Sequence, residues 1–114
     1  MDILNIIFAL LSIGLGCFGW LAPAYTMGAL DLTPGKTSMG ASEVRASVGA
    51  LFVGLGVGAL IIGSADAYAI LGFAWAGAAI GRGTSLVLDG QSTKKWIYFA
   101  VEAAVAIGAL WVNL

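Results

Sequence analysis

The sequence has no histidine and only one cysteine, Cys17, among its 114 residues. Without histidine, the chain lacks the commonest protein metal ligand and the usual acid–base catalyst at neutral pH. One cysteine excludes an intrachain disulfide and a cysteine metal cluster, so we interpret Cys17 as a small apolar packing residue. No nucleophile–base pair or metal-ligand cluster is visible. We therefore expect a protein that is not an enzyme, with no metal and no cofactor.

Charge is also scarce. Only 10% of the residues are charged, 61% are hydrophobic and the net charge is −1, whereas soluble domains have about 25% charged and about 45–50% apolar residues. The few basic residues form no tract that would bind nucleic acid. Together with a mean hydropathy of +1.01, this composition predicts an integral membrane protein that is surrounded by membrane lipid.

Long apolar runs dominate what the chain does contain. A membrane-spanning helix needs about 20 apolar residues, and the predicted spans are residues 3–21, 42–63, 67–88 and 95–112. The runs are continuous rather than alternating, which favours helices over barrel strands. The predicted fold is all-α, an integral membrane four-helix bundle that forms a single domain over residues 1–114. The first run has no basic start and no cleavage site, so we expect a retained helix rather than a signal peptide.

The longest connection, residues 22–41, contains both prolines of the chain, Pro23 and Pro34. Loops of this length are uncommon without structure of their own. Two alternatives stay open for it: a short interfacial helix or lid near residues 24–30, or a plain surface loop.

The basic residues predict the orientation of the spans. With four spans, the 22–41 connection and the 89–95 turn lie on one side of the membrane, and both termini lie on the other. All the basic residues lie on or nearer to the first of these sides: Lys36, Arg45, Arg82, Lys94 and Lys95. The positive-inside rule therefore predicts that both of these loops are cytoplasmic and that both termini are outside.

Glycines recur along the predicted spans, and several follow helical spacing. Glycine at such positions lets membrane helices approach one another closely. Two pairs have the GxxxG spacing, Gly54 with Gly58 and Gly77 with Gly81. No Walker lysine follows either pair, which argues against a phosphate-binding loop. We predict helix packing at five glycines: Gly49, Gly54, Gly58, Gly77 and Gly81.

Charged residues inside the spans are rare. Arg82 precedes Asp89 by about two helical turns, and Glu102 follows Lys95 by the same distance. Each therefore lies about 10 Å from the end of its helix that meets the 89–95 turn. An arginine at that depth is costly unless an opposite charge is near, and equal depth on antiparallel helices predicts an Arg82–Glu102 pair. We expect one buried charged layer: Glu43, Arg45, Arg82, Asp89 and Glu102.

Two interpretations of this layer stay open. In the first, the layer fixes which helices meet and in what register, without a need to add net stability. The chain is then a non-enzymatic accessory subunit or oligomeric component, packing through small-residue faces against itself or a larger membrane complex. In the second, the layer lines a polar path, Glu102 binds and releases protons, and the chain is a small proton- or ion-coupled transporter or channel.

A series of short motifs resembles a known family. The motifs are Glu43-Val44-Arg45-Ala46, Gly81-Arg82, Asp89-Gly90 and Glu102, in that order. They resemble a family of small bacterial four-helix membrane proteins described only as a domain of unknown function, and the likeness covers about residues 43–107. The resemblance implies four transmembrane helices in the bacterial inner membrane and implies no activity. The chain is also similar in size to small multidrug transporters but lacks their first-helix glutamate.

Overall fold

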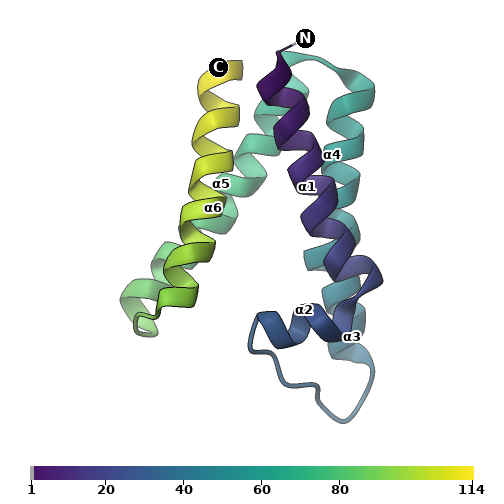
Figure 1. The fold of residues 1–114 in the computed structure, drawn as a ribbon, viewed down its shortest axis with the longest axis vertical. Coiled ribbons are helices and arrows are strands. Elements are labelled where there is room, and N and C mark those ends of the chain that lie inside the picture. Colours follow the sequence, from purple (N-terminus) through teal and green to yellow (C-terminus); the bar gives the residue numbers. More distant parts are fainter. Residues whose placement is uncertain (1) are drawn as a thin grey trace. The chain divides into compact units, whose positions relative to one another are not determined.

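The chain is helical throughout its regular structure. A computed structural model describes residues 2–114, and Figure 1 shows it as a ribbon coloured along the sequence. The described residues contain no β-strand. Their helices are α1 (Ile3–Leu21), α2 (Pro23–Ala29), α3 (Met39–Glu43), the π-helix η1 (Val44–Ala50), α4 (Leu51–Ile62), α5 (Ala65–Leu88) and α6 (Thr93–Asn113). The all-α class predicted from the sequence is confirmed.

Four helical stretches are long and apolar enough to cross a membrane. They are Ile3–Leu21, Met39–Ile62, Ala65–Leu88 and Thr93–Asn113, and the second of them joins α3, η1 and α4 without a break. Large apolar side chains lie on the outside: Val87 is 81% exposed and Trp111 is 86% exposed. Apolar surface on helices of this length suits contact with lipid. Together these helices indicate a multi-pass membrane protein.

Serine caps begin α5 and α6. The hydroxyl oxygens of Ser64 and Ser92 each accept a hydrogen bond from the backbone amide three residues on, at 3.2 Å in both helices. Each serine satisfies an amide that would otherwise lack a partner in the first turn, and the two helices begin two residues earlier than predicted. Gly63 and Gly90 have φ values of 68° and 88°, which glycine adopts at little cost because it has no Cβ.

The connection after α1 contains a helix of its own. Helix α2 begins at Pro23, whose fixed φ and missing amide suit the first helical position. The Thr26 hydroxyl donates a hydrogen bond to the carbonyl of Ala22 at 3.0 Å, and Thr26 and Met27 are buried. Of the two alternatives for residues 22–41, the structure contains the short helix.

The second span contains a π-helical segment, η1. The backbone amide of Leu51 donates to the carbonyl of Ala46, five residues back, instead of four. The residue pattern did not predict this segment, because it contains no proline and its sequence, VRASVGA, suits an ordinary helix. Segments of this kind are rare in helices and occur frequently at functional sites. Here the segment contains Gly49, at which the second span meets α1.

By its internal contacts the chain divides into two compact units, which are described separately. Unit 1 contains the chain up to Phe8 together with Ile62–Leu114, and unit 2 contains Ala9–Ile61. In unit 1, α5 packs against α6, and the buried side chains of the two helices include Tyr68, Leu71, Trp75, Val105 and Ala109. Gly72 makes room for this contact, because a Cβ there would lie 3.0 Å from Leu110 Cγ.

In unit 2, α1 packs against the second span through backbone atoms. A Cβ at Gly16 would lie 2.7 Å from the carbonyl oxygen of Gly49, and a Cβ at Gly19 would lie 2.8 Å from Gly49 Cα. A Cβ at Gly49 itself would overlap the backbone of Gly19 and Trp20. These glycines therefore allow a helix–helix distance that no larger residue permits, as is common in membrane proteins.

Two further small residues, Ser12 and Gly56, extend the contact between α1 and the second span. A Cβ at Gly56 would lie 2.6 Å from the carbonyl oxygen of Ala9. Ser12 is fully buried, and its hydroxyl donates a hydrogen bond to the carbonyl of Phe52 at 2.9 Å. The hydroxyl has a polar partner, so its burial leaves no unpaired group.

The two GxxxG pairs do not form such contacts. A Cβ at Gly54, Gly58, Gly77 or Gly81 would meet no heavy atom of its own unit within 4 Å. Of the five glycines predicted to pack, Gly49 alone contacts another helix of its own unit closely, among the residues that the structure describes. The helical face that meets a neighbour depends on the whole pairing of two helices, so the spacing of glycines along one helix does not determine it.

Candidate functional site

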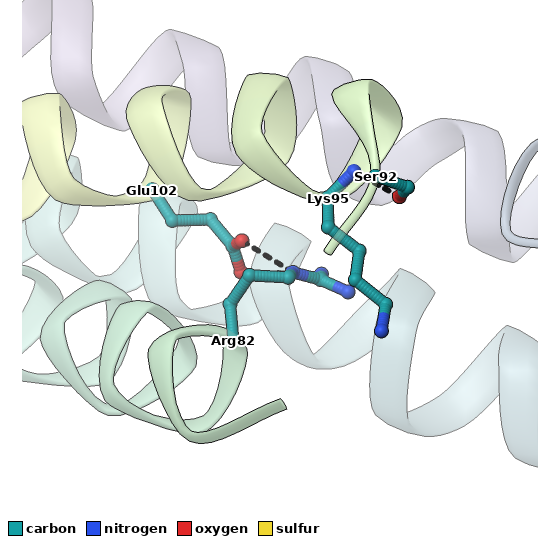
Figure 2. Close-up of polar contacts among 4 residues, drawn as sticks. All are labelled: Arg82, Ser92, Lys95 and Glu102. Atoms are coloured by element: carbon teal, nitrogen blue, oxygen red, sulfur yellow. Dashed lines mark hydrogen bonds and ion pairs between the residues drawn. The ribbon is translucent and has the colours of Figure 1, made fainter. Parts of the chain in front are cut away.

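An ion pair between α5 and α6 forms the candidate site in unit 1. Figure 2 shows Arg82 and Glu102 facing each other from these two helices. Arg82 Nε donates to Glu102 Oε1 at 2.9 Å, and Arg82 Nη2 donates to Glu102 Oε2 at 3.4 Å. Two parallel N–H···O contacts make this a charge-assisted pair with a defined orientation. The structure brings together the two charges that lie at equal depth in the sequence pattern.

The two members of the pair differ in exposure. The Glu102 side chain is 11% exposed, whereas the Arg82 side chain is 32% exposed. A carboxylate that is nearly enclosed needs an opposite charge, because an isolated buried ion is very costly. Arg82 supplies that charge, and a third of its side chain still reaches the surface.

Tyr98 is the third member of the site. The guanidinium carbon of Arg82 lies 5.5 Å from the centroid of the Tyr98 ring, within the range of a cation–π interaction. Tyr98 and Glu102 lie one turn apart on one face of α6, so a single helix presents an aromatic ring and an anion to Arg82. Tyr98 was missed from the sequence, although its i, i+4 spacing from Glu102 is a usable signal.

Lys95 stabilises the end of α5. Its Nζ donates to the backbone carbonyls of Gly90 at 2.8 Å and Asp89 at 3.3 Å, and its backbone amide donates to Ser92 Oγ (Figure 2). The last carbonyls of a helix lack helical partners and form the negative end of its dipole. The side chain of Asp89 is exposed, and Lys95 contacts its carbonyl rather than its carboxylate.

The other two residues of the predicted layer, Glu43 and Arg45, belong to unit 2, and both are exposed. Glu43 Oε2 accepts a hydrogen bond from Ser47 Oγ at 3.1 Å. Arg45 Nη1 donates to the backbone carbonyl of Trp20 at 2.7 Å. Arg45 thus contacts a carbonyl at the end of α1 rather than a carboxylate, and a layer that joins all five charges stays a prediction.

A second polar pair in unit 1 joins the start of α1 to the end of α6. Asn5 Nδ2 donates to Asn113 Oδ1 at 2.9 Å, and Asn113 Nδ2 donates back to Asn5 Oδ1 at 2.6 Å. Asn5 is 6% exposed. The pair was missed from the sequence because its members are 108 residues apart and no local spacing relates them.

These contacts define what the site can do chemically. Among residues 2–114, no group of three or more histidine, cysteine, aspartate or glutamate side chains is placed to hold a metal. The described part of the chain also contains no buried side-chain nitrogen or oxygen without a partner. Two nitrogens of Arg82 donate to the two carboxylate oxygens of Glu102, which fits a contact that joins α5 to α6.

The family of the chain follows from its match to a family model. Residues 1–113 match the model of a family described as a domain of unknown function, DUF4345. No curated protein and no solved structure matches the chain. The chain belongs to the DUF4345 family, in agreement with the resemblance of its motifs to a family of unknown function.

Proposed function

We propose that the chain is a non-enzymatic accessory or self-associating component of the bacterial inner membrane. Its four membrane-length helices support a location in the bilayer. In this proposal the helices form one four-helix bundle and a single domain. Loops 22–41 and 89–95 are cytoplasmic and both termini are outside, because the basic residues lie on or nearer to the side of these two loops.

The observation that carries the proposal is the open space beside the two GxxxG pairs. Within their own units, Gly54 with Gly58 on α4, and Gly77 with Gly81 on α5, have no heavy atom within 4 Å of a Cβ position. In lipid, apolar side chains gain little by leaving the acyl chains, so helices associate chiefly where small residues allow close packing. We assign these two faces to a transmembrane helix of a second copy or of a larger complex.

The charged site supports the same proposal. The Glu102 carboxylate is nearly enclosed and its two oxygens both accept from Arg82, an arrangement suited to joining two helices. The alternative of a proton- or ion-coupled transporter requires Glu102 to exchange its partner during a cycle. If Glu102→Gln abolishes a proton-coupled flux in proteoliposomes, the transporter alternative replaces our proposal.

Substitution of the open glycines tests the proposal. Gly54→Leu and Gly77→Leu fill the two faces, and we expect each variant to lose its self-association or its co-purifying membrane partner while the monomer stays folded. Gly14→Leu is the matched control, because Gly14 of α1 also has no atom within 4 Å of a Cβ position and belongs to no GxxxG pair. Association is measured by crosslinking in native membranes, followed by purification and mass spectrometry.

The result that contradicts the proposal is equally defined. If the wild-type chain is extracted under the mildest conditions as a monomer with no co-purifying protein, the proposal is wrong. It is also wrong if all three leucine variants keep the same crosslinked species as the wild type.

A further inference from the structure

A groove in unit 2 brings together polar residues that lie outside the Arg82–Glu102 site. The groove has a volume of about 550 Å³, and its lining includes Trp20, Ser38, Ser42 and Arg45 together with three alanines. We propose that this groove binds the anionic phosphate headgroup of a membrane phospholipid. The inference rests on the membrane location in the proposed function and adds to it a specific ligand.

Arg45 supplies the charge that such a headgroup requires. Its guanidinium has five N–H donors, and its one hydrogen bond in the described chain runs from Nη1 to the Trp20 carbonyl at 2.7 Å. Arg45 forms no ion pair with a described carboxylate of unit 2. Glu43, the nearest acid in sequence, instead accepts from Ser47 and lines a separate groove. The groove therefore contains a cation with free donors and no counter-charge of its own.

The other lining residues extend this donor set. Ser38 and Ser42 line the same groove. The backbone amide of Ser42 donates to the carbonyl of Ser38 at 3.0 Å, and neither serine hydroxyl makes a hydrogen bond in residues 2–114. A planar guanidinium with neighbouring hydroxyls matches the several acceptor oxygens of a phosphate. The contact with the Trp20 carbonyl holds the guanidinium in place before a ligand arrives, which lowers the ordering cost of binding.

The surroundings favour a lipid over a free anion. Trp20 is 43% exposed at the end of α1, the position at which tryptophan marks the membrane interface. Ala46 and Ala50 lie about one and two turns after Ser42, towards the middle of the second span, and they also line the groove. They leave an apolar wall for an acyl chain. In the proposed orientation the groove faces the cytoplasmic leaflet, where basic pockets bind acidic headgroups.

Native mass spectrometry tests this inference on the full-length purified protein. The probes are phosphatidylglycerol, phosphatidylcholine and soluble glycerol 3-phosphate, each added at the same concentration. We expect one retained phosphatidylglycerol per chain, weaker retention of phosphatidylcholine and no retention of glycerol 3-phosphate. Arg45→Gln removes the charge and shortens the side chain by two bonds, and we expect it to bind phosphatidylglycerol about tenfold more weakly.

Two further variants keep the test decisive. Lys36 lies in the 22–41 connection and does not line the groove. Lys36→Gln therefore removes one positive charge outside the groove, and this variant should bind phosphatidylglycerol as the wild type does. If Arg45→Gln does not fold, the double variant Ser38→Ala/Ser42→Ala removes two donors without touching the contact to α1, and its retention should fall several-fold.

The contradicting outcomes are separate from those of the proposed function. Equal retention of phosphatidylglycerol by wild type and Arg45→Gln, or by wild type and the double alanine variant, overturns the site. Equal retention of the two phospholipids overturns the role of headgroup charge, and retention of glycerol 3-phosphate overturns the assignment to a lipid. The oligomeric state is read from the same spectra, so loss of association tests the proposed function independently.

Discussion

The two units of this protein join their helices by different means. In unit 2, α1 meets the second span through backbone atoms, with Gly16, Gly19 and Gly49 in close contact. In unit 1, α5 and α6 pack through buried side chains such as Leu71 and Val105, and Arg82 with Glu102 adds a charged pair. A backbone contact leaves no room for an added atom. A side-chain pair tolerates changes of shape but depends on the presence of both partners.

The comparison shows two solutions to one physical problem. Helices in lipid gain little from burying apolar side chains, so their association depends on close packing and on polar contacts. Unit 2 uses close backbone packing between its helices, whereas unit 1 combines side-chain packing with a charged pair. Each unit also contains a contact of the other kind. In unit 2 the Ser12 hydroxyl donates to a carbonyl, and in unit 1 Gly72 makes room for close packing.

The largest expected effect is on the backbone contact. Gly49→Ala adds one methyl group where a Cβ would lie 2.6 Å from the Gly19 carbonyl carbon. Neither backbone can move away without separating the helices, so we expect a loss of about 3 kcal/mol in the free energy of unfolding in detergent. Gly14→Ala, with no atom within 4 Å of its Cβ, is the control and should be neutral or slightly stabilising. If Gly49→Ala is as stable as Gly14→Ala, the backbone contact does not distinguish unit 2 from unit 1.

A smaller loss is expected from breaking the ion pair. Glu102→Ala leaves Arg82 without its carboxylate. Breaking a fully buried pair costs about 3–5 kcal/mol and breaking an exposed pair about 0–1 kcal/mol. Because the Arg82 side chain is 32% exposed, we expect an intermediate loss of about 2 kcal/mol, measured by thermal unfolding in detergent. Glu43→Ala, at an exposed position, is the matched control. If Glu102→Ala is as stable as Glu43→Ala, the Arg82–Glu102 pair does not hold α5 to α6.

The smallest effect concerns the aromatic ring beside Arg82. Tyr98→Leu keeps an apolar side chain but removes the ring, and we expect a loss of about 0.5–1 kcal/mol. Tyr98→Phe keeps the ring face and should retain most of that stability. If phenylalanine is as destabilising as leucine, the phenolic hydroxyl matters and the cation–π contact does not account for the role of Tyr98.

The helices and the ion pair could be predicted because their signals are local. Long apolar runs predict membrane-length helices, and equal distances of Arg82 and Glu102 from one turn predict their contact. The starts of α5 and α6 were placed two residues late, although Ser64 and Ser92 carry the capping signal.

The remaining features depend on which distant segments meet. The GxxxG spacing predicts a small-residue face but not which helix covers it, and the close contacts of unit 2 use Gly16, Gly19 and Gly49 instead. The Asn5–Asn113 pair joins the two ends of the chain. No pattern within one helix contains that information.

An exchange of the two charges tests most directly whether the ion pair joins α5 to α6. Arg82→Glu and Glu102→Arg each place like charges together, and we predict that each variant is strongly destabilised. The double variant restores opposite charges across the same helices and should recover a large part of the lost thermal stability. A double variant that is no more stable than the less stable of the two single variants would contradict the account.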